Sequence, residues 1–338
     1  MSAALAVGVL AAGCGSGASE SEESPSPTGA PSGGFANPVL DMNFPDPQIV
    51  RDGDTWVAIA TNGNTMNVQT ATSPDLVTWT AGGDALPSVA SWSAEGKVWA
   101  PETVKIGDKW VMYYTTRAPD PEIQCLSIAV ADKAAGPYVD DSTEPLVCES
   151  DVGGTIDASP FIDRDGTAYL SWKNDGNAVA ADTWISIQEL APDGRSLVGK
   201  PTRLIQQDLP WEGDLVEASY LWVDDTSGTP VYHLFYSANS YADERYAVGH
   251  ATATSPLGPF TKDPEPVLVT NDVAVGPGHN ALVATGDEVW MVYHAWNPEA
   301  VGDDTVGRSM WLSRVRFGDD GSVKVDPPAK AVPQRPTM

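Results

Sequence analysis

Positively charged side chains are scarce in this chain. Among its 338 residues, 19 are Lys or Arg against 46 Asp or Glu, which gives a formal net charge of -27. Binding to nucleic acid or to anionic lipid needs clustered Lys and Arg, so the charge argues against both classes of partner. A neutral partner such as carbohydrate is compatible with this charge, which solubility alone would also explain.

A long apolar run is also missing. The small apolar stretch at residues 1–13 is too short to span a bilayer as a helix, and it leads into Cys14 and a Ser/Gly/Pro/Glu tract. We interpret 1–13 as a signal peptide, Cys14 as a lipidated cysteine and 14–36 as a flexible lipoprotein linker. Two features depart from this pattern, namely Ala11 in the cleavage motif and the lack of Lys or Arg before the apolar stretch. A plain secretory signal is the alternative; both interpretations predict export, with membrane contact only through a lipid at Cys14.

Cysteine is nearly absent as well. Besides Cys14, the chain has only Cys125 and Cys148, an even pair in a protein expected in an oxidising compartment. Cys125 opens the apolar run CLSIAV and Cys148 ends PLVC, so two neighbouring strands would bring the thiols together. We expect a disulfide rather than two free thiols or a metal site.

Helical periodicity is lacking too, because 31 Gly and 28 Pro interrupt the chain too often for long helices. Short runs rich in Val, Tyr, Trp and Ile recur instead, and Asp/Gly turns precede most of them, as in hairpins. These runs are TWVAIAT, KWVMYYT, TAYLSW, YHLFYS and EVWMVYH.

An ionisable residue stands just ahead of the first strand of each repeating unit. These residues are Asp46, Glu102, Asp157, Glu217 and His279, at intervals of 56, 55, 60 and 62 residues. Units of four short strands at a near-constant period predict an all-β chain, folded over 37–338 as a five-bladed β-propeller. Equivalent positions in a propeller converge on the central channel, so these five side chains are expected to meet at its mouth.

Such a ring has the groups that glycoside hydrolysis needs, because one protonated and one ionised carboxyl group on either side of a sugar are its minimum. Neighbouring charges move the pKa values of such groups apart. Asp46 lies between Pro45 and Pro47, which stiffen the backbone on both sides of it. Acidic residues before strands also occur on solvated loops, which is the simpler alternative.

Five segments, one in each predicted blade, resemble glycoside hydrolase family 43, whose members are five-bladed propellers that hydrolyse glycosidic bonds with inversion. The segments are NFPDPQIV, VWAPETVKIGDKWVMYYT, GTIDASPFIDRDGTAYLSW, LVEASYLW and VGPGHNAL. The resemblance implies an inverting hydrolase of pentose or furanose linkages, above all of the α-L-arabinofuranosidase type, and the N-terminal segment predicts that this hydrolase is exported. Its implied substrates are arabinan, arabinoxylan, arabinogalactan or their oligosaccharides, and it implies no cofactor for catalysis.

The resemblance also implies a role for each matching residue. Asp46 in FPDP corresponds to the general base that activates water, and Glu217 in LVEAS corresponds to the general acid. Asp157 in TIDASP corresponds to the aspartate that raises the pKa of the acid and orients it. Ser219 stands where the family often has Pro, and Asp214 is the alternative acid.

Three further residues match positions that face the substrate or the channel. Trp99 in VWAPE corresponds to an aromatic wall beside the sugar. Arg308 in VGRSM corresponds to an arginine that reaches the sugar, with Arg314 and Arg316 as alternatives. His279 in GPGHN matches a histidine that, in arabinan-cleaving members, helps to hold a central cation such as Ca²⁺ through water; the alternative is a structural histidine.

Some interpretations stay open at this stage. Glu102 follows a WAP motif that tolerates several residues there, so we interpret it as a supporting residue. SANSYADERY, residues 237–246, is either a substrate subsite or a solvated loop. A fructan-type retaining propeller hydrolase is one competing function, but it carries Arg-Asp-Pro where this chain has TIDASP. A carbohydrate-binding propeller is the other, but it repeats one motif in every blade.

Overall fold

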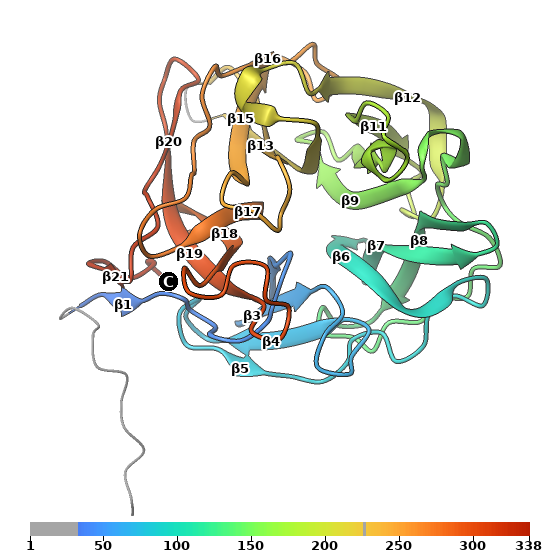
Figure 1. Cartoon of the computed structure of the whole chain (residues 1–338), viewed down its shortest axis with the longest axis horizontal. Helices are drawn as coiled ribbons and strands as arrows, with labels where there is room; N and C mark the ends of the chain where they lie inside the picture. The colour runs from blue at the N-terminus through green and yellow to red at the C-terminus, as the bar shows by residue number, and fades with distance from the viewer. Residues whose placement is uncertain (1–32, 226–227) are drawn as a thin grey trace, which may run out of the picture.

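The computed structural model describes residues 33–225 and 228–338. In this part of the chain, five small antiparallel sheets surround a common centre, and the chain order runs once around the ring (Figure 1). Three short 3-10 helices lie in connecting segments: Ser150–Val152 (η1) and Pro210–Glu212 (η3) between blades, and Gly176–Val179 (η2) within blade 3. The predicted all-β, five-bladed propeller is therefore confirmed.

Each blade begins with its innermost strand and continues outward through antiparallel pairs. Blade 1 has β2 (Gln48–Asp52), β3 (Thr55–Ala60), β4 (Gln69–Ser73) and β5 (Thr80–Ala81). Blade 2 has β6 (Ala94–Ile106), β7 (Lys109–Pro119) and β8 (Glu122–Ala131), and blade 3 has β9 (Thr155–Ile162), β10 (Ala168–Asn174), β11 (Trp184–Leu190) and β12 (Leu197–Gln206). Blade 4 has β13 (Val216–Asp224), β14 (Val231–Ala238), β15 (Ala247–Ala253) and β16 (Thr261–Lys262), and blade 5 has β17 (Val275–Thr285), β18 (Glu288–Trp296), β19 (Arg308–Phe317) and β20 (Val323–Val325).

The predicted Asp/Gly turns do connect inner strands to their neighbours. Gly53 and Gly107 sit in the β2–β3 and β6–β7 turns with φ of 64° and 63°, a left-handed conformation that glycine adopts without a Cβ clash. The second strand of each blade reads as a nearly continuous apolar run because a neighbouring blade covers each of its faces. In β18, for example, every residue but Val289 is fully buried.

The hydrophobic core is divided into five clusters, one between each pair of neighbouring blades. Blades 1 and 2, for example, pack through Val57, Ile59, Trp110 and Met112. Burial of apolar surface at about 25 cal/mol per Å² makes these clusters the main stabilising term. The innermost strands stay in contact around the ring, so they form a rigid frame for the channel.

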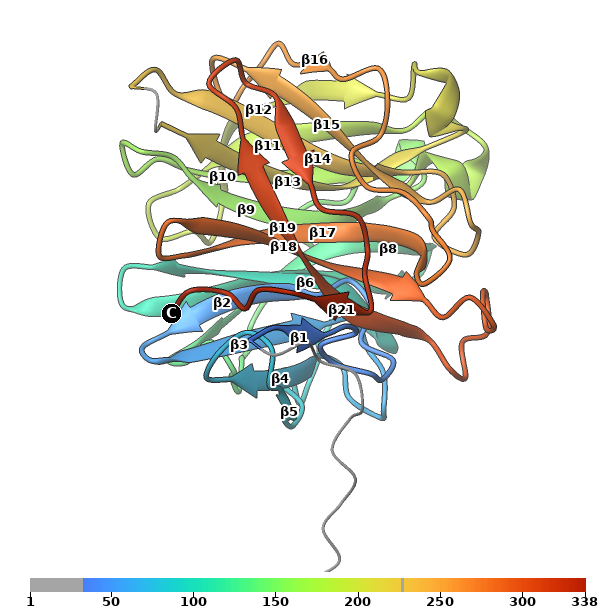
Figure 2. The same cartoon turned by 90° about the vertical axis from the view of Figure 1, so that its left-hand side faces the viewer.

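The two ends of the described chain close this ring. Strand β1 (Phe35–Ala36) pairs with β21 (Ala331–Val332), and Figure 2 shows the two side by side. The segment after β1 also contacts blade 5, because the Phe44 N–H donates to the Arg308 carbonyl at the start of β19, at 2.8 Å. The closure therefore brings Asp46, at the start of blade 1, beside the last blade.

Two sequence predictions meet the fold directly. Phe35, in the segment predicted as linker, is 2% exposed and belongs to the core, so the propeller begins two residues earlier than predicted. Cys125 and Cys148 form the expected disulfide, with their Cα atoms 4.7 Å apart. Residues 1–32, with the signal peptide, Cys14 and most of the linker, lie outside the described residues.

Candidate active site

Every blade has a left-handed residue at its innermost strand, just before the strand in blade 1 and within the strand in blades 2 to 5. These residues are Asp46, Ala100, Asp157, Ala218 and His279, with φ between 43° and 58°. In blades 2 to 5 each one lies within a register shift against the second strand, which is a β-bulge. A non-glycine residue in this conformation costs on the order of 1–2 kcal/mol, so the surrounding structure must hold it.

A hydrogen bond from the preceding blade holds each left-handed residue. In four cases its N–H donates to a side chain of the preceding blade, at the same place on or just beyond that blade's second strand. These bonds are Ala100 to Thr61 Oγ1 at 2.7 Å, Asp157 to Thr115 Oγ1 at 3.1 Å, His279 to Ser237 Oγ at 2.8 Å and Asp46 to His294 Nδ1 at 3.1 Å. In blade 4 the Ala218 N–H donates to Asp157 Oδ2 instead, at 3.0 Å.

This register corrects the predicted ring. Asp46, Asp157 and His279 are equivalent, but blades 2 and 4 carry Ala100 and Ala218 at that position. Glu217 precedes the left-handed residue by one position, and Glu102 follows it by two. A repeat interval of about 60 residues does not predict these offsets of one or two residues, because a bulge adds a residue to the strand without changing the interval noticeably.

Glu102 does not reach the pocket that the other predicted residues share. Its Oε2 accepts from Ser159 Oγ at 2.9 Å and from Gln48 Nε2 at 3.2 Å, which links three neighbouring innermost strands. It is 4% exposed, and burial raises the pKa of this carboxyl group well above its usual value. Glu102 therefore supports the channel from inside the protein, as the sequence suggested.

One pocket of about 370 Å³ collects the remaining predicted residues. Asp46, Trp99, Asp157, Glu217, His279 and Arg308 all line it. Asp214, the alternative acid, is exposed and does not line it. Arg314 and Arg316, the alternatives to Arg308, form ion pairs with Glu288 and Asp326 instead.

Asp46 is surrounded by groups that favour its ionised form. Arg308 Nη1 lies 3.0 Å from its Oδ1, His279 Nδ1 lies 3.4 Å from the same oxygen, and Thr61 Oγ1 donates to its Oδ2. Burial alone would raise the pKa of Asp46, but Arg308 and His279 outweigh it and hold this pKa well below its usual value. Asp46 is therefore an ionised carboxylate that can accept a proton from water.

Asp157 and Glu217 share the other side of the pocket. Burial raises the pKa of Asp157 to about 6, and the nearby Glu217 carboxylate adds to this effect. Glu217 is held at both oxygens: Tyr246 Oη donates to Oε1 at 2.8 Å, and Lys173 Nζ donates to Oε2 at 3.1 Å. By accepting the Ala218 N–H, Asp157 fixes the bulge directly after Glu217, which sets the direction of the Glu217 side chain.

Several residues of this pocket were not predicted from the sequence, and three more lie in a segment for which two interpretations stayed open. Asp175 and Asn177 reach it from the segment at η2, and the SANSYADERY segment contributes Ser240, Tyr241 and Tyr246. Tyr241 is 43% exposed and stacks on the Arg308 guanidinium, 4.5 Å from its ring centre. The substrate-subsite interpretation of this segment agrees with its position. Lys173, which contacts Glu217, was also not predicted; its signal in the sequence is a lysine directly after the apolar run YLSW.

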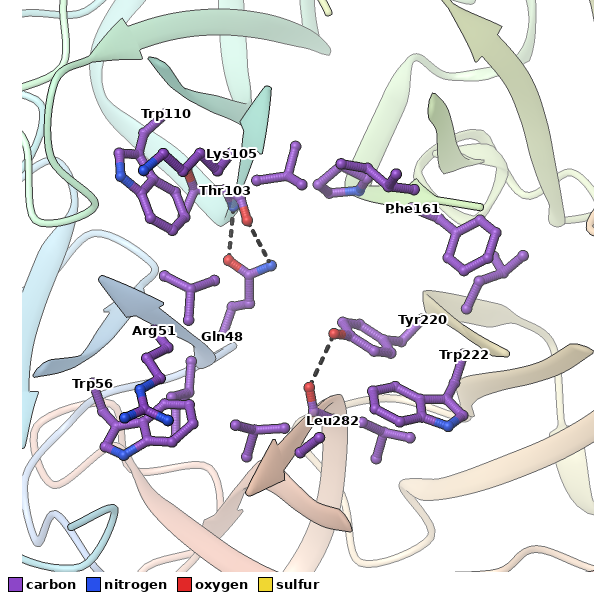
Figure 3. A pocket seen from close by; sticks show the side chains of 18 of the residues that line it. Gln48, Arg51, Trp56, Thr103, Lys105, Trp110, Phe161, Tyr220, Trp222 and Leu282 are labelled. Carbon is purple, nitrogen blue, oxygen red and sulfur yellow. Dashed lines mark hydrogen bonds between the residues drawn. The ribbon is translucent and has the colours of Figure 1, made fainter. Parts of the chain in front are cut away.

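A second cavity, of about 450 Å³, opens where the innermost strands end (Figure 3). Aromatic rings from several blades surround it, among them Trp56, Trp110, Phe161 and Trp222, and Arg51 and Lys105 lie over two of these rings. No Asp or Glu lines this cavity. This cavity lacks the carboxyl pair that glycoside hydrolysis needs, so we assign that chemistry to the pocket at Asp46.

Two further sequence expectations concern metals and membranes. Across residues 33–225 and 228–338, no group of three or more His, Cys, Asp or Glu side chains is arranged to hold a metal ion. His279 contacts Asp46 directly, and a central cation held through water stays a prediction. The same residues include no helix with the length and apolar character needed to cross a bilayer.

The comparisons with known proteins agree with this geometry. The family model "Glycosyl hydrolases family 43" matches residues 35–323. The β-D-galactofuranosidase xynD of Aspergillus niger is 28% identical over 262 residues, covering 74% of this chain and 72% of that protein. An extracellular exo-α-(1→5)-L-arabinofuranosidase of Streptomyces avermitilis is 26% identical, covering 87% of this chain and 63% of that protein, so the chain spans less than two thirds of this relative.

Solved structures give the same result. One described as a thermostable family-43 glycoside hydrolase superposes with a TM-score of 0.80 at 29% identity, and the match covers 90% of this chain and 99% of that chain. The family match extends over most of the chain, and the pocket contains the carboxyl groups that the reaction requires. The chain therefore belongs to glycosyl hydrolases family 43 and is a glycoside hydrolase.

Proposed function

We propose that this protein is an inverting hydrolase that releases α-L-arabinofuranose units from arabinose-containing polysaccharides or oligosaccharides. The observation that carries the proposal is the convergence of Asp46, Asp157, Glu217 and Arg308 on one pocket. The names of the Aspergillus niger and Streptomyces avermitilis relatives, a galactofuranosidase and an arabinofuranosidase, support a furanose ring as the sugar bound there.

In the proposed reaction, Asp46 is the general base and Glu217 is the general acid. Asp46 removes a proton from water on one face of the sugar while that water attacks the anomeric carbon. Glu217 gives its proton to the glycosidic oxygen as the bond to the anomeric carbon breaks. A general acid or base at such a position contributes roughly 10²–10⁴-fold to the rate.

The other pocket residues position these groups and the sugar. Asp157 fixes the bulge after Glu217 and, when ionised, opposes ionisation of this acid by like-charge repulsion. Arg308 holds Asp46 ionised and is in reach of a sugar hydroxyl. Trp99 forms a half-buried aromatic wall of the pocket, a surface on which a sugar ring packs well.

Export belongs to the same proposal. The apolar stretch at 1–13 and Cys14 support a signal peptide with a lipid anchor, and the Streptomyces avermitilis relative is described as extracellular. Labelling of cells with a fatty acid analogue tests the anchor. We expect label on the wild-type protein and none on Cys14→Ser.

The activity is tested with the purified protein on 4-nitrophenyl α-L-arabinofuranoside, β-D-galactofuranoside and β-D-xyloside, and on linear arabinan. We expect the highest kcat/KM on the arabinofuranoside, with Asp46→Asn inactive and the exposed-site control Asp41→Asn fully active. Preference for the galactofuranoside or the xyloside would replace the proposed sugar. Turnover that survives in Asp46→Asn would contradict the proposed base.

A further inference from the structure

Lys173 stands at a position on the second strand of blade 3 where the other blades carry a hydrogen-bond acceptor for the next left-handed residue. It lies on β10 opposite Ile156, which directly precedes the left-handed Asp157. The other four blades carry Thr61, Thr115, Ser237 or His294 at the equivalent position, and each accepts the N–H of the next left-handed residue. A lysine ammonium has no lone pair to accept that bond, so the Ala218 N–H uses Asp157 instead.

The ammonium of Lys173 is directed at the pocket wall rather than at the backbone. Its side chain is 0% exposed. Lys173 Nζ donates to Asn177 Oδ1 at 2.6 Å and to Glu217 Oε2 at 3.1 Å, and it lies 3.9 Å from Asp175 Oδ1. Removing an ammonium group from water is costly unless its partners compensate. A hydroxyl group is sufficient to hold the backbone at this position in three of the other blades. The fold therefore does not require a lysine here, and we look to the reaction for the reason that one is present.

We propose that Lys173 is a positioning residue for the general acid, which holds Glu217 toward the leaving oxygen and stabilises the carboxylate that forms as its proton departs. This inference rests on the proposed function, in which Glu217 is the general acid. Tyr246 Oη holds the other oxygen of Glu217 at 2.8 Å, so the carboxyl group is clamped between two donors. Asp157 and Asp175 also face Lys173 in this cluster, with Asp46 and His279 across the pocket.

The charge changes in the reaction define what Lys173 does. The proton of Glu217 passes to the glycosidic oxygen, and the electron pair of the bond to the anomeric carbon goes to that oxygen. The water oxygen bonds to the anomeric carbon, and its proton goes to Asp46. Glu217 thus becomes negative during the step. The Lys173 ammonium is already in place beside it, so no group has to reorganise to stabilise this charge.

A consequence separates this role from a structural one. A leaving group that is stable as an anion needs little protonation in the transition state, whereas a poor leaving group needs nearly full protonation. Loss of Lys173 should therefore reduce the rate more as the leaving group becomes more basic. A residue that only maintains the fold would affect all substrates by the same factor.

The test uses purified Lys173→Met and Lys173→Gln on α-L-arabinofuranosides whose leaving groups run from 4-nitrophenol through phenol to methanol. We expect kcat/KM to fall by about threefold or less with 4-nitrophenol and by roughly 10²-fold with methanol. Glu217→Gln should show the same trend with larger losses. Lys173→Gln keeps a polar but uncharged head group on a slightly shorter side chain, so it provides the measurement if Lys173→Met does not give a cooperative melting transition.

The matched control is Lys262→Met. Lys262 is also nearly buried, at 8% side-chain exposure, and pairs with Asp208 and Glu212 away from the pocket. Loss of Lys262 should lower the melting temperature, and any change in kcat/KM should be the same for every leaving group. An equal loss on all leaving groups in both Lys173 variants overturns the inference while leaving the proposed function intact. A wild-type protein that hydrolyses no member of the series contradicts the proposed function, and the inference falls with it.

Discussion

The two mouths of the channel are built from the same five innermost strands, yet they differ in chemistry. Where the strands begin, buried carboxyl groups and an arginine line a pocket of about 370 Å³, and the buried Lys173 contacts one of these carboxyl groups, Glu217. Where they end, aromatic rings and aliphatic side chains surround a cavity of about 450 Å³ (Figure 3). Both mouths are concave, so shape alone does not identify the site of the chemistry.

The difference comes from the bulges at one end of the strands. At the end with the aromatic cavity, the innermost strands keep regular register with their neighbours. At the other end, one left-handed residue per blade turns the backbone and directs side chains such as Asp46 and Asp157 into the channel mouth. The comparison predicts that changes at the bulged mouth alter catalysis, whereas changes at the regular mouth alter stability alone.

The largest effect is expected for Asp46→Asn. An amide does not act as a general base, so kcat should fall by about 10³-fold or more. The amide is nearly isosteric and keeps the backbone bond of Asp46 to His294, so the fold should persist. Steady-state kinetics and circular dichroism, with Asp41→Asn as the matched control, check both statements; activity within tenfold of wild type would remove Asp46 from the mechanism.

A smaller loss, of roughly 10²-fold, is expected for Arg308→Met. Burial raises the pKa of Asp46, and Arg308 is the largest of the influences that lower it. Without the guanidinium this pKa rises, so the acidic limb of the profile of kcat/KM against pH should move to higher pH. Arg316→Met, which breaks an exposed ion pair with Asp326, should leave the limb in place; an unmoved limb in Arg308→Met would contradict the assignment.

Asp157→Asn should change activity and stability in opposite directions. The neutral amide no longer opposes ionisation of Glu217, so activity should fall and the alkaline limb of the pH profile should move to lower pH. Burial raises the pKa of Asp157 from 3.8 to about 6. The wild-type fold therefore loses stability as pH rises from about 4 to about 6, by at most roughly 3 kcal/mol, and the loss persists above pH 6.

The amide variant avoids this loss because it carries no charge at any of these pH values. Its melting temperature should equal that of the wild type near pH 4 and exceed it above pH 6, as measured by thermal melts across this range. A variant that is less stable than the wild type at pH 7 would contradict the desolvation account of Asp157.

The smallest effect on activity is expected at the opposite mouth. Phe161→Leu removes aromatic area from a side chain that is 8% exposed, so the free energy of unfolding should fall by about 1 kcal/mol. Its kcat/KM should stay within twofold of the wild type. A tenfold loss of activity would show instead that the two mouths are coupled.

Much of this arrangement was predictable from sequence, for reasons that lie in particular residues. Apolar runs such as KWVMYYT and the Asp/Gly turns before them repeat at a period near sixty, so the blades and their order followed. Asp46 and Asp157 were found because each stands directly at the left-handed position of its blade. Glu217 was found through its motif, although its register differs by one residue.

What sequence did not give depends on the direction of side chains across blades. Lys173 contacts Glu217 across 44 positions of chain, through a bulge that shifts which strand positions face the pocket. The Tyr246 hydroxyl and Asn177 reach the pocket from loops whose path the strand pattern does not define. Glu102 matched the period but lies two residues beyond the left-handed Ala100, which is why it supports the channel instead of lining the pocket.

The most direct test of the proposed mechanism is the configuration of the first sugar released, followed by proton NMR as 4-nitrophenyl α-L-arabinofuranoside is hydrolysed. With Asp46 activating water on the face opposite the leaving group, we expect β-L-arabinofuranose to appear first and then equilibrate. Initial release of the α-anomer would mean that the configuration is retained, and it would contradict the assignment of Asp46 and Glu217 as base and acid of a single displacement.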